Sequence, residues 1–155
     1  MTNTSRTATR ARRTAAQTTA LVVGALFLVV GIAGFIPGVT TNFDTITFAG
    51  HRSQALLLGV FQVSILHNIV HLLFGVAGIA MARTHHAARS YLIGGGIVYL
   101  LLFAYGLIVD RASEANVVPL NDADNWLHLV LGAGMVVLGL ALGRPHNDVD
   151  RTTTS

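Results

Sequence analysis

The stretch "LHNIVHLLFGVAG", Leu66 to Gly78, places two histidines and an asparagine at the head of an otherwise apolar segment. A second stretch, "DNWLHLVLGAGM" from Asp124 to Met135, repeats the order Asn, two residues, His, Leu, two residues, Gly. Both stretches lie in apolar segments long enough to cross a bilayer, where polar side chains are costly unless they face protein. The sequence therefore predicts membrane helices that turn a polar face toward the protein interior.

The composition is that of a membrane protein. The 155 residues are 52% hydrophobic and 11% charged, whereas a soluble domain carries about 25% charged residues. The absence of cysteine excludes thiolate metal ligands and thiol catalysis. The arginines lie in short flanks rather than in a stripe with aromatic residues, so the net charge of +3 does not indicate nucleic acid binding. The expected partner is the lipid bilayer, with a second copy of the chain or another membrane protein as a further partner.

Four segments are long enough to cross the hydrocarbon core, which takes about 20 apolar residues in a helix. They cover residues 18–36, 65–82, 91–109 and 126–143, within a membrane domain of residues 17–144. Residues 1–16 are predicted to be a disordered basic tail and residues 145–155 a polar tail. The predicted fold class is all-α, an integral membrane four-helix bundle built from two repeated two-helix hairpins.

The arginines gather at one end of the predicted helices. Only Arg52 and Arg111 lie in the two long loops, and the other arginines precede the first span, separate the second from the third, or follow the fourth. Positively charged flanks remain on the cytoplasmic side of a membrane. We therefore expect a multi-pass protein of the cell inner (plasma) membrane with both termini in the cytoplasm.

The chain has the pattern of a duplicated helix pair. Besides the Asn/His match, "LVVGALFLVVGIAGFI" from Leu21 aligns with "LIGGGIVYLLLFAYGLI" from Leu92, and this alignment sets Gly24 against Gly95. Copies with two spans each insert in the same orientation. The expected result is a parallel repeat about an axis along the membrane normal.

The first long loop contains two short patterned segments. "TITF" at residues 45–48 alternates and predicts a short strand or extended piece. "ALLLGVF" at residues 55–61 is too short to span a membrane. Residues 55–64 form either a separate interfacial helix or an extension of the second span into a long tilted helix.

Two polar, glycine-rich helix faces follow from the spacing, because residues three, four and seven apart share one side of a helix. The second span aligns Asn68, His71, Gly75 and Gly78, and the fourth aligns Asn125, His128, Gly132, Gly139 and Gly143. We expect these two faces to meet inside the bundle. Asn68, His71, Asn125 and His128 would then form a polar cluster near the outer helix ends.

The first hypothesis for this polar cluster is structural. Asn and His side chains can hydrogen-bond between membrane helices and fix their packing or an interaction surface. No serine accompanies His and Asp in a nucleophile motif, so we expect no enzymatic activity and no cofactor under this hypothesis.

Three alternatives use the same residues to bind or move something. His67, His71, Asp124 and His128 provide three imidazoles and a carboxylate, a donor set that suits zinc or another divalent transition metal. His71 and His128 could instead be opposed axial ligands of haem b in the bundle core. A third alternative is proton or small-solute transport by an oligomer, through the intramembrane histidines and the outer aspartates.

The stretch "LLGVFQVSILHNIVHLLFGVAGIAMA", followed by "DNWLHLVLGAGM", resembles a family of small, mostly actinobacterial, four-helix membrane proteins classed as a domain of unknown function. The resemblance covers residues 18–143, and its most specific piece is "LHNIVHL" with Gly75 after it. Ser64 and Ile65 stand where the resemblance leads us to expect Asn and Pro. The resemblance implies an integral membrane protein and assigns no activity.

Overall fold

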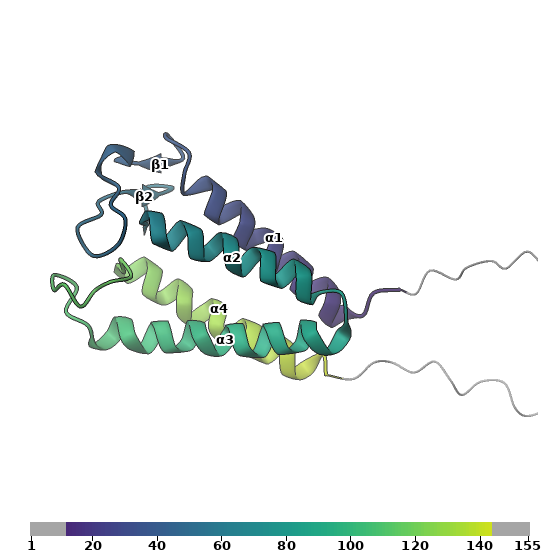
Figure 1. The fold of residues 1–155 in the computed structure, drawn as a ribbon. Helices are drawn as coiled ribbons and strands as arrows, with labels where there is room; N and C mark the ends of the chain where they lie inside the picture. The colour runs from purple at the N-terminus through teal and green to yellow at the C-terminus, as the bar shows by residue number, and fades with distance from the viewer. Residues whose placement is uncertain (1–11, 144–155) are drawn as a thin grey trace, which may run out of the picture.

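The computed structural model describes residues 12–143, which fold into four helices and a small sheet (Figure 1). The helices are α1 (Ala15–Ala33), α2 (Ile65–Met81), α3 (His85–Ile108) and α4 (Asp122–Ala141). α1 lies along α2 and α3 lies along α4, so the helices form two hairpins. We call the end with residues 34–64 and 109–121 the loop end, and the opposite end the terminal end. The predicted tails fall largely at residues 1–11 and 144–155, outside the described residues.

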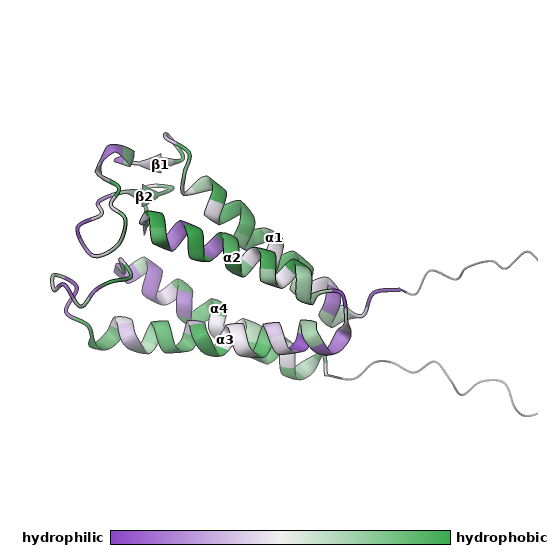
Figure 2. Ribbon diagram, in the orientation of Figure 1, coloured by the Kyte–Doolittle hydropathy of each residue, from purple (hydrophilic) through white to green (hydrophobic). Residues whose placement is uncertain are grey.

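Three of the described helices, α1, α3 and α4, are long and apolar enough to cross a membrane. The fourth, α2, is apolar but shorter, with 17 residues. In Figure 2 the helices are mainly hydrophobic, and hydrophilic residues gather in the loops and toward the loop end of α2 and α4. The helices have the composition and length of a membrane protein.

Each helix begins at a side chain that caps its first turn. The hydroxyl of Thr14 accepts a hydrogen bond from the backbone N–H of Gln17, and that of Thr84 accepts one from Ala87. Ser64 caps α2 in the same way, through a 3.2 Å bond from the N–H of His67. A serine therefore serves at the position where the family resemblance led us to expect asparagine, because either side chain can accept this bond.

The prediction that residues 55–64 are helical was wrong. The strands β1 (Thr40–Thr41), β2 (Leu56–Leu57) and β3 (Phe61–Gln62) form an antiparallel sheet in that order. Leu58 and Gly59, in the three-residue link between β2 and β3, both have positive φ, at 54° and 72°. Such a backbone closes a hairpin and cannot continue a helix. The apolar residues of this segment form part of the sheet, and Leu57 of β2 is buried in a small apolar cluster.

The segment "TITF" is not a strand. Its first residue ends the 3₁₀ helix η1 (Phe43–Thr45), and extended chain follows from Ile46. The carbonyls of Thr47 and Phe48 accept hydrogen bonds from the N–H groups of Ile65 and Leu66, at 3.1 and 2.8 Å. Because the first N–H groups of a helix have no partner within it, this segment completes the start of α2.

Close backbone contact holds each hairpin together. A Cβ added to Gly24 of α1 would lie 2.9 Å from the carbonyl oxygen of Gly75 in α2. A Cβ added to Gly96 of α3 would lie 2.7 Å from the carbonyl oxygen of Gly132 in α4. The glycines of α2 and α4 therefore pack on α1 and α3 rather than on each other, which corrects the glycine part of the predicted contact between the two faces.

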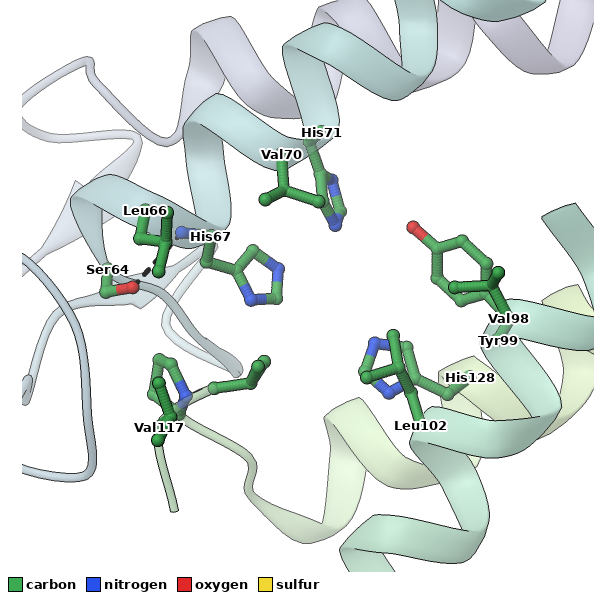
Figure 3. A pocket seen from close by; sticks show the side chains of 12 residues that line it. Ser64, Leu66, His67, Val70, His71, Val98, Tyr99, Leu102, Val117 and His128 are labelled. Carbon is green, nitrogen blue, oxygen red and sulfur yellow. Dashed lines mark hydrogen bonds between the residues drawn. The ribbon is translucent and has the colours of Figure 1, made fainter. Parts of the chain in front are cut away.

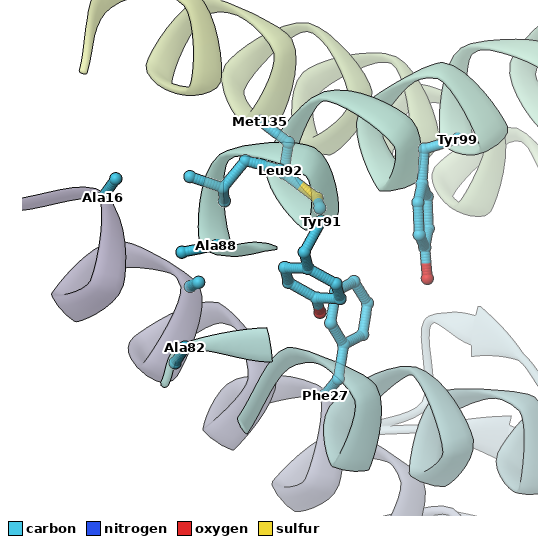
Figure 4. Close-up of a cluster of buried hydrophobic side chains, with 9 residues drawn as sticks. Ala16, Phe27, Ala82, Ala88, Tyr91, Leu92, Tyr99 and Met135 are labelled. Carbon is cyan, nitrogen blue, oxygen red and sulfur yellow. The ribbon is translucent and has the colours of Figure 1, made fainter. Parts of the chain in front are cut away.

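The two hairpins meet along an apolar core (Figure 4). Phe27 of α1, Tyr91 and Tyr99 of α3 and Met135 of α4 belong to this core, together with small alanine side chains near the terminal end. At the loop end, hydrogen bonds and an ion pair join the two long loops. The N–H of Gly50 donates to the carbonyl of Val117 at 2.8 Å, and Arg52 pairs with Glu114.

Candidate functional site

The two asparagines of the polar cluster fill space beside glycines. Asn68 is buried on α2 directly against Gly34, where an added Cβ would overlap its amide. Asn125 is buried on α4 in the same relation to Gly106. The Nδ2 of Asn68 and the Oδ1 of Asn125 have no hydrogen-bond partner among the described residues. Each asparagine therefore packs against a glycine of its own hairpin, and these two atoms make no interhelical hydrogen bond with the described residues.

The two histidines of the polar cluster face a cavity instead. His71 and His128 are 8% and 3% exposed, and both line a cavity of about 210 Å³ together with His67 and Tyr99 (Figure 3). Within residues 12–143, the Nδ1 atoms of His71 and His128 are buried without a hydrogen-bond partner. We call this space the His/Tyr cavity. The Nδ1 atoms of His71 and His128 can therefore still donate or accept a hydrogen bond.

A row of aromatic contacts connects the two histidines through all four helices. The rings of His71 and Phe27 meet edge to face with centroids 5.4 Å apart, and those of Tyr99 and His128 do so at 5.2 Å. Phe27 stacks on Tyr99 between them. His67 extends the row, with its ring centroid 4.5 Å from that of His71. Each helix thus contributes a ring to this row, and the rings of α2, α3 and α4 line the cavity.

The same rings also border a second, smaller cavity. It measures about 100 Å³ and shares His67, His71, Tyr99 and His128 with the His/Tyr cavity. Its outer side is lined by sheet residues, including Leu57 and Phe61. The larger cavity is lined on its outer side by Val70 of α2 and Val98 of α3, both 43% exposed. The sheet therefore covers the side of the smaller cavity, and the larger cavity is bordered by exposed valines of α2 and α3 and by residues 117–119 of the second long loop.

Asp124, which we predicted as a fourth metal donor, has a structural task. Its Oδ2 accepts hydrogen bonds from the backbone N–H groups of Gln62 and Asn121, at 2.9 and 3.1 Å. The carboxylate thereby caps α4 and ties β3 to it. Within residues 12–143, no group of three or more His, Asp or Glu side chains is arranged to hold a metal ion.

Sequence reasoning did not include Phe27 and Tyr99 in the site. The available signal was an aromatic residue three positions after a glycine in both helices, Gly24 with Phe27 and Gly96 with Tyr99. The alignment from the sequence set Gly24 against Gly95, one residue away from Gly96. Phe27 was therefore not aligned with Tyr99.

Three described helices of membrane-spanning length and apolar composition indicate a helical membrane protein. Residues 17–141 match the family described as "Domain of unknown function (DUF4383)", and the chain belongs to that family. This match confirms the resemblance to a family of unknown function. No curated protein and no solved structure matches the chain.

Proposed function

We propose that this is a non-enzymatic membrane protein that binds a small ligand in the His/Tyr cavity. The observation that carries the proposal is the pair of buried imidazoles, His71 and His128, whose Nδ1 atoms lack partners and which line the same cavity. A buried polar group without a hydrogen bond costs about 1–3 kcal/mol. A ligand that hydrogen-bonds to these imidazoles would offset that cost.

The architecture we propose is a four-helix bundle of two repeated hairpins. Its support is a set of equivalent contacts in the two hairpins. The contact Gly24–Gly75 of the first hairpin corresponds to Gly96–Gly132 of the second. In the same way, Gly34–Asn68 corresponds to Gly106–Asn125. This correspondence sets Gly24 against Gly96 and corrects the alignment from the sequence by one residue.

The repeat makes the two sides of the site equivalent. His71 contacts Phe27 as His128 contacts Tyr99, and the two central rings stack on each other. The proposed repeat axis therefore passes between Phe27 and Tyr99. The histidines lie on either side of it.

In the membrane, we propose that α2 spans together with α1. Its 17 residues measure about 25 Å at 1.5 Å per residue, close to the thickness of the hydrocarbon core. At the terminal end, Arg12, Arg13 and Arg83 share one hollow between α1 and α2. Because positively charged flanks remain in the cytoplasm, this hollow supports a cytoplasmic position for both termini in the inner (plasma) membrane.

The proposal divides the polar cluster into two parts. Asn68 and Asn125 keep the packing role of the first hypothesis, because each fits against a glycine of its own hairpin. His71 and His128 have the binding role, because they border the cavity. Loss of an asparagine should therefore reduce stability, and loss of a histidine should reduce binding.

The test is to identify what the protein carries when it is purified in mild detergent from its own membranes, without a metal-binding tag. Organic extraction with mass spectrometry, an absorption spectrum and elemental analysis cover organic ligands, haem b and metal ions. We expect about one bound molecule per chain, absent from a His71→Phe/His128→Phe double variant.

The matched control is His86→Phe, which changes an exposed histidine at the terminal end of α3. This variant should keep the ligand. A wild-type protein that carries nothing, or a double variant that carries as much as the wild type, would overturn the proposed function. A Soret band or stoichiometric metal would support it and identify the haem b or metal ligand predicted from the sequence.

A further inference from the structure

We propose that the ligand of the His/Tyr cavity is a lipid-soluble carbonyl compound of the quinone class, which reaches the cavity sideways from the bilayer between α2 and α3. This inference rests on the proposed function. It adds the class of ligand and the route by which the ligand arrives.

The route follows from the unequal covering of the two cavities. On the α1/α4 side, Leu57, Leu58 and Phe61 of the sheet region stand in front of the smaller cavity. The larger cavity is bordered by apolar side chains of α2 and α3, including Val70, Val98 and Leu102, and at the loop end by residues 117–119. Since we propose that α2 and α3 both cross the membrane, the exposed side chains of Val70 and Val98 would face lipid at this opening. A ligand from the lipid phase can pass it without giving up hydration.

The polar groups of the cavity lie on separate walls. His67 and His71 come from α2, Tyr99 from α3 and His128 from α4, and in Figure 3 their rings converge on one space. A neutral imidazole has one N–H donor, and a phenol has one O–H donor. The cavity therefore presents hydrogen-bond donors from opposed sides across an apolar interior.

Tyr99 differs from the two other tyrosines in where its hydroxyl can bond. The hydroxyl of Tyr91 donates to the carbonyl of Phe74 at 3.2 Å, and that of Tyr105 donates to the carbonyl of Ala115. The hydroxyl of Tyr99 points into the His/Tyr cavity (Figure 3). Together with the unpartnered nitrogens of His71 and His128, it forms a set of donors that a ligand with two acceptors can use.

The chemistry and the size of the cavity both favour a quinone. A quinone carries two carbonyl acceptors on opposite edges of a flat apolar ring, which matches donors on opposed walls. An apolar cavity of about 150 Å³ holds one benzene molecule. The 210 Å³ of the His/Tyr cavity therefore fits one substituted ring, and an isoprenoid tail would leave through the apolar opening into lipid.

The first experiment compares two probes of the same shape. Menadione has the two ring carbonyls, and 2-methylnaphthalene lacks them while partitioning into detergent. We would measure binding of each to the full-length protein, stripped of lipid-soluble ligand, by thermal shift and by competition with the co-purified molecule. We expect menadione to bind about 5- to 150-fold more tightly, since each of its two carbonyls can accept a hydrogen bond worth about 0.5–1.5 kcal/mol.

Three variants examine the walls and the opening. Tyr99→Phe removes only a hydroxyl, and we expect it to weaken menadione about tenfold without changing the binding of 2-methylnaphthalene. Val98→Trp should close the opening and slow the binding of both probes. Its control is Leu101→Trp on the same helix, since Leu101 is 65% exposed and does not line the cavity.

The outcomes separate this inference from the proposed function. Equal affinity for the two probes, or an unchanged menadione affinity in Tyr99→Phe, would overturn the quinone class. Unchanged binding rates in Val98→Trp would overturn the lateral route. A co-purified ligand without carbonyl groups that is lost from the double histidine variant would overturn the quinone class alone and leave the proposed function standing. A protein that carries nothing and binds neither probe would overturn both.

Discussion

The ring of Phe27 stacks on the ring of Tyr99, with centroids 5.4 Å apart and planes inclined by 27°. This pair joins α1 to α3, and both rings are almost completely buried. His71 and His128 contact the two rings edge to face and border the cavity. Toward the terminal end, the core is apolar. The stack therefore marks the boundary between the packed core and the site.

Truncating this stack should cost much of the stability. We expect Tyr99→Ala to lower the free energy of unfolding by about 3–5 kcal/mol, because it leaves a large hole beside Phe27. Tyr99→Phe keeps the stacked ring and should change stability by less than about 1 kcal/mol. Unfolding by denaturant in detergent, followed by circular dichroism, measures both. A stable Tyr99→Ala protein would contradict the position of the ring in the core.

The glycine contacts of the second hairpin can be tested within a single helix. Gly96→Ala should destabilise strongly, because the new methyl group would lie 2.7 Å from the carbonyl oxygen of Gly132 and 2.9 Å from the backbone nitrogen of Val136. Gly94→Ala meets nothing within 4 Å and should gain up to about 1 kcal/mol from helix propensity. The measurement is the melting temperature of each variant. Equal effects of the two substitutions would rule out close α3/α4 contact.

The packing role of the asparagines predicts coupling between Asn68 and Gly34. Gly34→Ala alone should destabilise the protein, because its Cβ would overlap the Asn68 amide. Asn68→Ala removes that amide, so adding Gly34→Ala to it should cost less. A double-mutant cycle on unfolding free energies should give a coupling of about 0.5–3 kcal/mol. Strict additivity of the two changes would show that the side chains are not in contact.

The buried histidines should not be needed for stability. His128→Phe keeps a ring against Tyr99 and removes a buried nitrogen that has no partner among residues 12–143. We therefore expect an unchanged or higher melting temperature in the ligand-free protein, since exchange of an unsatisfied polar group for an apolar group of similar shape is neutral or stabilising. His128→Ala should lower the melting temperature, because it leaves a cavity where the ring was. A large drop in the melting temperature of His128→Phe would show instead that the histidine has a packing role.

The two aspartates at the start of α4 should behave differently. Asp124→Ala loses the bonds from Gln62 and Asn121, and we expect a loss of about 1–3 kcal/mol in unfolding free energy. Asp122→Ala breaks a 2.6 Å ion pair with Arg111 at the surface, which should have little effect because exposed pairs contribute little. Hydrogen exchange at the N–H of Gln62 should rise in Asp124→Ala alone. Equal exchange in both variants would contradict the tie between β3 and α4.

The periodicity of the sequence was sufficient to identify the buried face of α2. The residues buried on that helix are Asn68, His71, Gly75 and Gly78, the set that helical spacing predicts. On α4, Asn125, His128, Gly132 and Gly139 are buried, as helical spacing also predicts. These results follow from local geometry alone, because the 3.6-residue period of a helix decides which side chains point the same way.

Helix starts and the outer loop were less predictable. α1, α3 and α4 begin before the apolar runs from which we predicted them, because polar caps such as Thr14 and Thr84 extend a helix beyond its hydrophobic part. Residues 55–64 are apolar over a length that suits either a short helix or a hairpin. Their pairing with Thr40 and Thr41 decided the outcome, and hydropathy contains no information on that pairing.

The sequence alone determined the helices, their polar faces and the family, because each of these depends on residues close together in the chain. The tertiary structure decided which helix each face contacts, that Asp124 is a cap and that Tyr99 belongs to the site. It also separated the asparagines, which pack on glycines, from the histidines, which border the cavity. These features depend on contacts between residues far apart in sequence, and periodicity along one helix does not specify what lies opposite it.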